Sequence, residues 1–349
     1  MSADHVVVTG GAGFIGGTVV SELLHRGLEV SVIDSLRRDV HRDGGRAGRE
    51  RLRGLAVRAV EADVRDLDAA RNALRGASAV VHLAAKVGLG VDIDDVDDYV
   101  SSNDLGTAVV LRACAAEDVP RVVVASSMVV YGEGRYTCAA HGVVHPGPRT
   151  REALVRGSFD PLCPVCGQVL VSGLVDEDAR LDPRNVYAAT KVAQEHLAAA
   201  WARETGGTAA SLRFHNVYGA GMPRDTPYAG VAAKFLSALD RGEAPTVFED
   251  GCQRRDFVHV SDVARAVAAG LGAGLTGHRA FNVGSGVVST IGDVARALSL
   301  MRSGPEPVVT GEFRLGDVRH ITASSERAAD ELGWRAQVGL SEGVKGLTT

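Results

Sequence analysis

A tyrosine and a lysine lie four residues apart in the segment NVYAATKVAQEHL, which has the pattern of a helix start. Only four of the 349 residues are lysine, so the spacing of Tyr187 and Lys191 calls for an explanation. Residues at this offset share one face of a helix. A phenol is a weak base at neutral pH, and a fixed ammonium beside it favours the phenolate. The pair predicts proton chemistry at a nicotinamide; an exposed tyrosine beside a solvated lysine is the alternative.

The amino-terminal segment HVVVTGGAGFIGGTVVSELLHRGLEVSVID predicts a strand, a glycine turn, a helix and a second strand. Gly10 permits the tight turn, Gly13 lets a pyrophosphate approach the backbone, and Gly16 lets helix and strand pack closely. The free N–H groups at the helix start favour a phosphate. This pattern predicts a dinucleotide site, with an ordinary glycine-rich turn as the alternative.

The end of the second predicted strand indicates which dinucleotide binds. Asp34 stands where a carboxylate accepts hydrogen bonds from the adenosine ribose hydroxyls, which favours NAD. Arg37 and Arg38 follow closely, and a 2′-phosphate could bind to them. NAD is therefore the predicted cofactor, and NADP stays open as the alternative.

Apolar runs that alternate with helical patterns must position these residues. Their order predicts an α/β protein with a parallel sheet covered by helices on both faces, and ligands at the carboxyl ends of the strands. We expect the segment 37–53 to be loop-like, a helix near 228–241, and a returning sheet strand in AFNVG near residue 280. The runs lie near residues 5–9, 29–33, 57–60, 79–83, 121–125 and 209–214.

Composition restricts the function classes. The chain is 45% hydrophobic and 23% charged, as in globular proteins, and 349 residues suffice for two lobes. A net charge of −5 gives no sign of a surface for polyanions, so nucleic acid is not an expected partner. No apolar segment approaches the length of a membrane span, and the first strand begins within a few residues of Met1. We expect a cytoplasmic protein without a membrane partner.

Ordered motifs along nearly the whole chain resemble the extended short-chain dehydrogenase/reductases, in particular the nucleotide-sugar epimerases and dehydratases. The shared order is more specific than any single motif. The matching pieces are TGGAGFIG, Asp34, ADV ending at Val64, HLAA from His82, NDLGT from Asn103, SSMVVYG from Ser126, YAATK, RFHNVYG from Arg213, RRDFVHVSDVA from Arg254 and NVGSG from Asn282.

The resemblance implies a Rossmann doubly wound parallel sheet, a smaller α/β substrate lobe and a cysteine-rich insert. Residues 1–215 would bind NAD, with the insert at 134–179, and residues 216–349 would mainly bind a nucleotide sugar, with segments that return to the sheet. A homodimer through helices near 95–117 and 186–206 is implied as well. The implied cofactor-binding residues are Gly10, Gly13, Phe14, Ile15, Gly16, Asp34, Ser35, Asp63, Val64, Leu83, Ala84, Ala85, Lys86, Asn103, Tyr187, Lys191 and His215.

The same resemblance assigns catalytic roles. Ser127 would hydrogen-bond the reacting sugar oxygen, Tyr187 would be the acid/base, and Lys191 would bind the nicotinamide ribose and lower the tyrosine pKa. The related 4,6-dehydratases carry an acid pair directly after this serine, where the chain has Met128 and Val129. Because neither side chain can carry a proton, the sequence favours epimerisation over elimination, with C4 as the expected position.

Residues that would bind the substrate come from the second half of the chain. Arg255 in RRDFVHV and Arg314 in RLGD resemble the diphosphate contacts of the sugar epimerases, and surface salt bridges are their alternative. Asn216 is a predicted donor to the substrate, and Asp317 would face the nucleotide sugar, which would be linked to dTDP or UDP. His215 could pack against the nicotinamide or be structural.

The insert between Tyr131 and Tyr187 holds three of the five cysteines. Cys138 and His141 form CxxH, and Cys163 and Cys166 form CxxC, a set typical of a closed structural zinc site. His145 could replace His141. A redox-active CxxC and unliganded thiols are the alternatives. Together with DSLRRDVH from Asp34, the insert is similar to the dTDP-L-rhamnose 4-epimerase group.

Two other functions stay open. In an NADP-dependent nucleotide keto-sugar reductase, Arg37 and Arg38 would bind the 2′-phosphate. A non-catalytic NAD-sensing regulator would keep the fold only, and it would have no need of Ser127, Tyr187 and Lys191 together.

Overall fold

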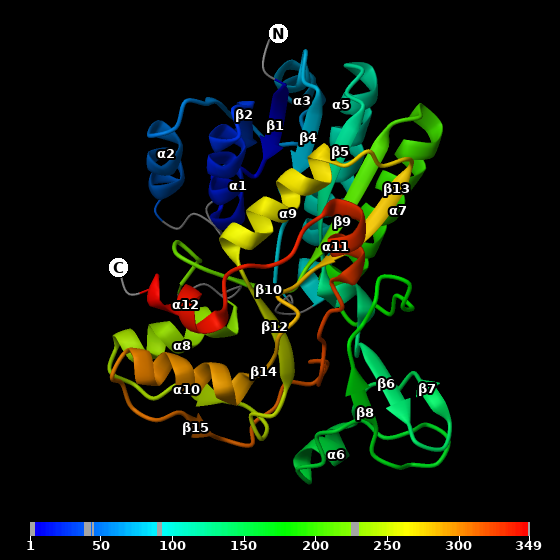
Figure 1. Ribbon diagram of the computed structural model, residues 1–349, viewed down its shortest axis with the longest axis vertical. Coiled ribbons are helices and arrows are strands. Elements are labelled where there is room, and N and C mark those ends of the chain that lie inside the picture. Colours follow the sequence, from blue (N-terminus) through cyan, green and yellow to red (C-terminus); the bar gives the residue numbers. More distant parts are fainter. Residues whose placement is uncertain (1–3, 38–42, 44, 89–92, 225–229, 348–349) are drawn as a thin grey trace.

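The computed structural model describes residues 4–37, 43, 45–88, 93–224 and 230–347. A seven-stranded parallel sheet forms the upper part of the molecule, with strand order β13-β9-β5-β4-β1-β2-β3 (Figure 1). This confirms the predicted α/β class and the returning strand near residue 280. The strands are β1 (His5–Thr9), β2 (Glu29–Asp34), β3 (Arg58–Glu61), β4 (Ala79–His82), β5 (Arg121–Ser127), β9 (Thr208–Phe214) and β13 (His278–Val283).

Helices cover both faces of this sheet, because the central strands are apolar on both sides. One face packs against α1 (Phe14–His25), α9 (Val260–Gly272) and α11 (Glu326–Leu332). The other packs against α3 (Leu67–Leu74), α5 (Gly106–Ala116) and α7 (Val186–Thr205). The short helix α4 (Val96–Tyr99) and a π-helical stretch over Val100–Leu105 lead into α5.

The expectation of a loop over residues 37–53 is partly wrong. Helix α2 spans Arg46–Arg53, and it begins after Gly45, whose φ of 83° suits glycine. Leu52 is buried, and Arg51 Nη1 donates to the carbonyls of Ala12 (2.5 Å) and Gly13 (2.9 Å). These tertiary contacts stabilise a helix whose sequence, rich in arginine and glycine, gives little helical signal. Residues 38–42 and 44 lie outside the described part.

A smaller lobe lies below the sheet in Figure 1, and its core is formed by α8, α10 and α12. The expected helix near 228–241 corresponds to α8. The lobe contains β10 (Asn216–Tyr218), β11 (Thr246–Val247), β12 (Arg254–His259), β14 (Val288–Thr290), β15 (Val308–Val309), α8 (Val231–Asp240), α10 (Ile291–Met301) and α12 (Leu340–Lys345). Its strands pair as β10-β12-β14 and β11-β15.

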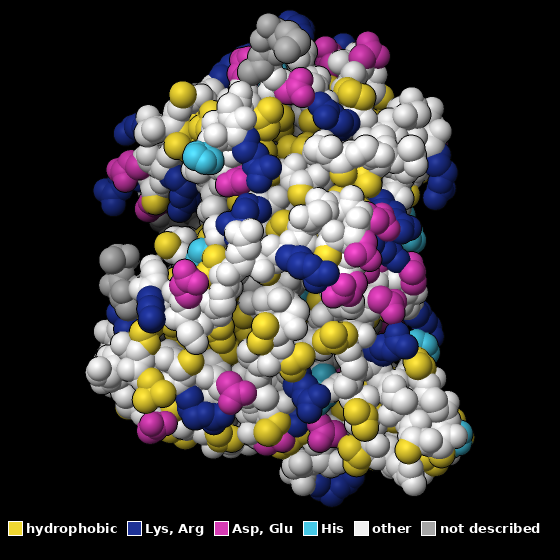
Figure 2. Space-filling view, viewed as in Figure 1, with side chains coloured by type: hydrophobic (Ala, Val, Ile, Leu, Met, Phe, Trp, Pro, Cys, Tyr) yellow, Lys and Arg dark blue, Asp and Glu magenta, His cyan; other side chains and the backbone are white. Residues whose placement is uncertain are grey.

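The insert forms a separate small layer at the lower right of Figure 1. Its strands β6 (Arg135–Cys138), β7 (Gly142–Val144) and β8 (Val171–Gly173) pair in the order β7-β6-β8, and α6 covers Arg151–Val155. Its buried cluster is small, and hydrophobic side chains are visible on this part of the surface in Figure 2. Exposed valines of the insert include Val143, Val155, Val165, Val169 and Val171.

The described residues include no helix that combines the length and the apolar character needed to cross a bilayer. On the face seen in Figure 2, basic and acidic side chains are interspersed.

Candidate active site

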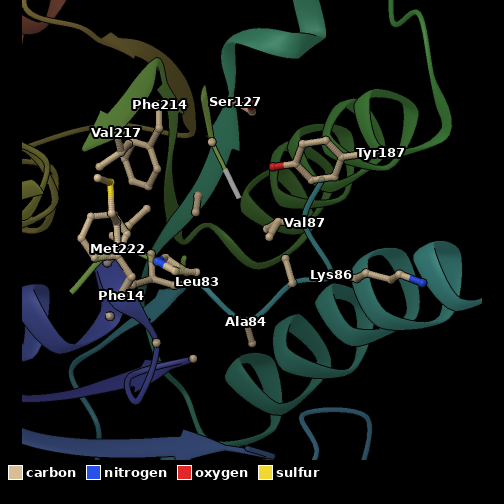
Figure 3. Close-up of a pocket in the computed structure, with 18 of the residues that line it drawn as sticks. Phe14, Leu83, Ala84, Lys86, Val87, Ser127, Tyr187, Phe214, Val217 and Met222 are labelled. Carbon is tan, nitrogen blue, oxygen red and sulfur yellow. The ribbon is translucent and has the colours of Figure 1, made fainter. Parts of the chain in front are cut away.

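A cavity of about 390 Å³ runs along the carboxyl ends of the sheet strands and reaches the smaller lobe. The sheet motifs and the YAATK helix converge on it, although they are far apart in the sequence (Figure 3). The predicted residues that line it are Gly10, Gly13, Phe14, Ile15, Gly16, Asp34, Ser35, Asp63, Val64, Leu83, Ala84, Ala85, Lys86, Ser127, Tyr187, Lys191, His215 and Asn216.

The glycine turn lines the cavity. Its close backbone contacts leave no room for side chains at these positions. A Cβ atom on Gly16 would come within 2.1 Å of the Gly10 carbonyl oxygen, and one on Gly10 within 2.8 Å of the Ala84 nitrogen. Gly10 also has a φ of 73°, which side chains rarely adopt. Helix α1 begins here without a side-chain cap, so its first N–H groups are available to a phosphate.

Asp34 ends β2 beside this turn. Its carboxylate accepts from the backbone N–H groups of Ala12 (3.0 Å) and Leu36 (2.9 Å), which fixes its orientation at the cavity wall. Arg37 bonds to both carboxylate oxygens of Asp98 (3.0 and 2.8 Å) and to the Ser102 hydroxyl (2.8 Å). This pairing gives Arg37 a structural role, and Arg38 lies outside the described residues.

Three predicted cofactor residues have roles that the sequence did not specify. Asp63 lines the cavity and pairs with Arg65 at 2.6 Å. The Lys86 side chain points away from the cavity in Figure 3, and its ammonium bonds to Asp95 (3.0 Å) and Asp98 (2.8 Å). Asn103 does not line the cavity.

Asn103 instead holds neighbouring elements together. It lies in the π-helical stretch and is fully buried. Its side-chain oxygen accepts from the Lys86 N–H (2.7 Å), and its amide donates to the Lys86 carbonyl (3.0 Å) and the Thr190 hydroxyl (2.9 Å). These bonds join the loop after β4 to α7, so Asn103 positions the wall that carries Tyr187.

Ser127, Tyr187 and Lys191 all line the cavity. Ser127 ends β5, and Asn185 caps the start of α7 by accepting from the Ala188 N–H at 2.8 Å. The Tyr187 hydroxyl points into the cavity in Figure 3. The Lys191 ammonium donates to the Ala125 carbonyl at 2.8 Å and lies 5.7 Å from the centre of the Tyr187 ring. The sequence therefore identified a group that the fold brings together.

The electrostatics of this group differ from the prediction. Burial raises the pKa of Tyr187 above its ordinary value, and the nearby Ser127 hydroxyl only partly offsets this effect. Burial also lowers the pKa of Lys191 to about 7, against the opposing charges of Glu195 and Asp104. Burial thus destabilises both charged forms in this structure, which opposes the predicted lowering of the tyrosine pKa.

A buried ion pair next to this group was not predicted from the sequence. Arg213 on β9 bonds to both carboxylate oxygens of Glu195 on α7 (3.0 and 2.8 Å), and both side chains are buried. Arg213 also donates to the Tyr131 hydroxyl at 2.7 Å, and the Ser126 hydroxyl donates to Glu195. This network joins α7 to β5 and β9. The motif RFHNVYG contains Arg213, but its partner is visible only in three dimensions.

His215 and Asn216 follow β9 at the far wall of the cavity. His215 is buried, neither ring nitrogen has a hydrogen-bond partner, and burial lowers its pKa to about 3. The side-chain oxygen of Asn216 is also buried without a partner. Buried polar atoms usually have partners, so these atoms mark a surface suited to a polar ligand.

The other predicted substrate residues do not line the cavity. Arg255 donates to the carbonyls of Arg254 (2.8 Å), Arg319 (2.9 Å) and Val318 (2.7 Å), which gives its guanidinium a structural role. Arg314 is exposed and lies over the Phe248 ring at 5.1 Å. Asp317 is half-buried.

The predicted metal ligands converge within the insert. The ligand atoms of Cys138, His141, Cys163 and Cys166 all lie within 4.8 Å of one another. Cys138 Sγ is 3.6 Å from Cys166 Sγ and 3.5 Å from His141 Nδ1, which in turn is 3.6 Å from Cys163 Sγ. Zn–S bonds of about 2.3 Å in a tetrahedron place sulfur atoms about 3.8 Å apart. These four residues could therefore hold zinc.

The fold and the pKa of Cys138 distinguish among the candidate metal ligands. His145 is exposed and is not part of the cluster, so His141 is the histidine that the fold selects. Hydrogen bonds from the Ala140 N–H and from His141 lower the pKa of Cys138 to about 6. This favours the thiolate, which is the form that binds metal.

Comparisons with known proteins agree with this geometry. The family model described as "NAD dependent epimerase/dehydratase family" matches residues 6–151 and 165–284, with an interruption inside the insert. The chain is 34% identical to dTDP-L-rhamnose 4-epimerase of Burkholderia thailandensis, over 99% of this chain and 94% of the relative. It is 32% identical to UDP-glucose 4-epimerase of Mycolicibacterium smegmatis, over 97% and 95% of the two chains.

Solved structures show the same similarity. MoeE5 in complex with UDP-glucuronic acid and NAD has a TM-score of 0.76 and 31% identity, over 98% of this chain and 97% of that chain. The UDP-glucose 4-epimerase of Thermus thermophilus in complex with NAD has a TM-score of 0.74 and 31% identity, over 98% and 96%.

Proposed function

Because the chain belongs to the NAD-dependent epimerase/dehydratase family, we propose that it inverts C4 of a nucleoside-diphosphate sugar through a transient keto sugar. The observation that carries this proposal is the convergence of Ser127, Tyr187 and Lys191 on a cavity that the glycine turn also lines. The relatives named as 4-epimerases support the position of inversion.

The cavity suits NAD. The glycine turn and the uncapped start of α1 would hold the pyrophosphate, and Asp34 would accept from the adenosine ribose. Lys191 would bind the nicotinamide ribose, and His215, whose ring nitrogens have no hydrogen-bond partner, lines the same cavity. When bound, NAD supplies a reversible acceptor for the C4 hydride and a positive charge that favours the Tyr187 phenolate.

The protein residues move and stabilise the proton. Tyr187 removes the proton of the C4 hydroxyl and returns it to the keto oxygen after the sugar has turned in the site. The Ser127 hydroxyl donates a hydrogen bond to that oxygen. Because burial raises the pKa of Tyr187, the charge of bound NAD would be needed to favour the phenolate that acts as the base, with the phenolic proton lost to solvent. The chemistry is redox-neutral, since the hydride returns to the same carbon.

Elimination of water is not supported by the residues after Ser127. Met128 packs against the buried cluster around Tyr131 and Ile321, and Val129 follows it. Asp34 and Asp63 are the carboxylates among the described lining residues, and both belong to the dinucleotide end. The sugar end thus lacks, within the described lining, an acid that could protonate a leaving hydroxyl.

We assign substrate binding mainly to residues 216–349 and NAD binding to residues 1–215, with β13 returning to the sheet. Asn216 offers a buried, unpartnered amide oxygen, while Arg314 and Asp317 belong to the segment whose Val318 and Arg319 carbonyls accept from Arg255. Arg255 would contribute by holding this segment. The nucleotide would be dTDP or UDP, the two carriers in the names of the relatives.

The insert would bind one zinc ion with a structural role. Four protein ligands leave no open position for a substrate, so the metal would not take part in hydride transfer. The small buried cluster around Tyr136 and Leu170 makes the metal the main source of order.

A homodimer through α5 and α7 is also part of this proposal. The segment that leads into α5 exposes Val96, Val100 and Leu105, which a second copy would cover.

The NADP-dependent reductase is less well supported, because Arg37 is engaged with Asp98 and Ser102. A non-catalytic NAD sensor would not require the Ser127, Tyr187 and Lys191 constellation.

The test is turnover without added cofactor. Purified protein is incubated with dTDP- and UDP-linked hexoses, and products are followed by NMR, while the dinucleotide released on denaturation is identified. We expect inversion at C4 and released NAD. Conversion that consumes stoichiometric NADPH would favour the reductase, and absence of any conversion with bound NAD would favour the sensor.

A further inference from the structure

The segment 314–319, which follows β15 in the smaller lobe, carries two residues proposed to bind the nucleotide sugar, Arg314 and Asp317. It is tied to β12, because the Arg255 guanidinium donates to the carbonyls of Val318 (2.7 Å) and Arg319 (2.9 Å). Phe257, two residues further along β12, lines the cavity. The position of this segment therefore affects where Arg314 and Asp317 lie relative to the proposed nucleotide-sugar site.

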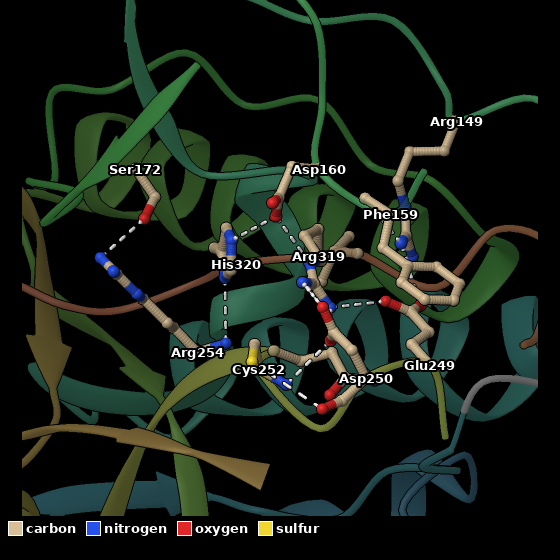
Figure 4. Close-up of polar contacts among 12 residues, drawn as sticks. Arg149, Phe159, Asp160, Ser172, Glu249, Asp250, Cys252, Arg254, Arg319 and His320 are labelled. Atoms are coloured by element: carbon tan, nitrogen blue, oxygen red, sulfur yellow. Dashed lines mark hydrogen bonds and ion pairs between the residues drawn. The ribbon is translucent and has the colours of Figure 1, made fainter. Parts of the chain in front are cut away.

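Arg319, the last residue of the segment, anchors it through a buried side chain. Its side chain is only 1% exposed, yet it carries a charge. The guanidinium bonds to Glu249 (2.8 Å) and to both oxygens of Asp250 (2.7 and 2.8 Å) from the smaller lobe. It also bonds to Asp160 of the insert at 2.9 Å, as Figure 4 shows. A buried charge needs such partners, so the insert supplies part of the anchor.

Arg149 of the insert makes a second contact with the same segment. Its side chain is 5% exposed and pairs with Glu249 at 2.9 Å. It also donates to the backbone carbonyl of Asp317 at 2.6 Å. Glu249 thus lies between two arginines, Arg149 and Arg319, and connects the insert, the lobe and the segment.

These contacts continue to the cysteine cluster. Glu133 accepts from the Arg319 N–H at 2.9 Å and from the Tyr136 hydroxyl at 3.3 Å. Tyr136 is fully buried and packs with Cys138 and Cys163. A chain of direct contacts therefore runs from the proposed zinc ligands to the backbone of the segment.

We propose that the insert positions the segment 314–319 for nucleotide-sugar binding, with Arg149 and Asp160 as its positioning residues. This inference rests on the proposed function, since it assumes that Arg314 and Asp317 face the nucleotide sugar. The insert acts on binding of the diphosphate end, and the reacting end at Tyr187 is set by the sheet. Loss of a positioning contact therefore weakens substrate binding and leaves the chemical step unchanged.

The main variant is Asp160→Asn, which removes the charge that faces Arg319 and keeps the shape. Asp176→Asn is a matched control, because Asp176 is 44% exposed against 45% for Asp160, and it pairs with Arg135 inside the insert. Arg149→Lys is the second variant; it keeps the charge but loses the planar fork. Melting temperatures and bound NAD verify that each variant is folded.

Binding of dTDP and of UDP to the NAD-loaded protein is measured by calorimetry, and KM and kcat with a nucleotide sugar that the wild type converts. We expect Asp160→Asn and Arg149→Lys to raise Kd and KM about fivefold, with kcat within about twofold and the control unchanged. Wild-type affinity in both variants would overturn the positioning role and leave the proposed function intact. If neither nucleotide binds to the wild type, the proposed function fails first, and this inference fails with it.

Discussion

The catalytic cavity and the cysteine insert are stabilised in different ways. The cavity lies at the carboxyl ends of the sheet strands. The central strands are almost completely buried, and a large apolar cluster covers each face of the sheet. The insert buries Tyr136, Cys138, Cys163 and Leu170, with Val144 packed against them, while several of its valines stay exposed. Burial of apolar side chains therefore orders the first region, and for the second we propose that bound zinc supplies the order.

This difference explains how each region can carry out its role. A deep core can hold ionisable groups such as Tyr187 and Lys191 in positions where burial shifts both pKa values. The insert lacks such a core, and it contacts the smaller lobe through arginines and carboxylates. The first region is suited to chemistry and the second to binding, and the predictions below test that division.

The largest expected effect is on activity, in the variant Tyr187→Phe. Loss of the phenol removes the acid/base, so we expect kcat to fall by about a thousandfold or more. NAD retention and metal content should be unchanged, because the ring keeps its packing. Tyr218→Phe serves as the control, since this buried tyrosine donates to the Gly339 carbonyl away from the cavity. Comparable activity in the two variants would remove Tyr187 from its role.

The second effect concerns the insert, in the variant Cys163→Ser. We expect zinc content, measured by mass spectrometry, to fall from about one ion per chain to near zero. Proteolysis within residues 134–179 should become faster, while NAD stays bound. Cys252→Ser is the control, because Cys252 is exposed and lies outside the cluster. Full zinc content in Cys163→Ser would contradict the assigned ligand set.

The third effect is on stability, in the variant Glu195→Gln. This change leaves the buried Arg213 without its charged partner, so we expect the free energy of unfolding to fall by about 3–5 kcal/mol. Chemical denaturation with paired fluorescence and circular dichroism measures it. Glu204→Gln, near the exposed end of the same helix, should change stability little. Equal stability of Glu195→Gln and wild type would show that the pair does not hold α7.

The fourth effect is a pH dependence of the NAD-free protein. The folded pKa of Lys191 is lowered to about 7, from an ordinary value of 10.5. Between these values the unfolded chain binds the proton that the folded protein has lost, so stability rises with pH across this window. Relative to Lys191→Met, the wild type should gain about 2 kcal/mol between pH 7 and pH 9. A constant difference would show that Lys191 stays charged when buried.

The sequence could reveal features that depend on local patterns, but not those that depend on contacts between distant residues. The strand, glycine turn and helix near the amino terminus are a local pattern, and the structure confirms these elements. The Tyr187 and Lys191 pair and the CxxH and CxxC motifs are also local patterns, and the structure brings the residues of each set together. Helix α2 was missed, because its stabilising contacts come from Arg51 at the glycine turn. Arg149, Asp160 and Arg319 were missed because their partners lie far away in the sequence, where spacing carries no signal.

Two predicted site residues have partners that the sequence does not reveal. The side chains of Lys86 and Arg255 belong to family motifs, but the sequence does not show which acceptors compete for them. Lys86 bonds to Asp95 and Asp98, and Arg255 bonds to backbone carbonyls. The position of a residue in a family motif therefore indicates where the residue lies more reliably than it indicates which group the side chain bonds to.

The central claim is that hydride leaves C4 and returns to C4 within one active site. The direct measurement uses a nucleotide hexose that carries deuterium at C4, incubated with the NAD-loaded protein in ordinary water without added cofactor. We predict that the inverted product retains deuterium at C4, as read by NMR and mass spectrometry. Replacement of the label by solvent hydrogen during inversion would contradict the account.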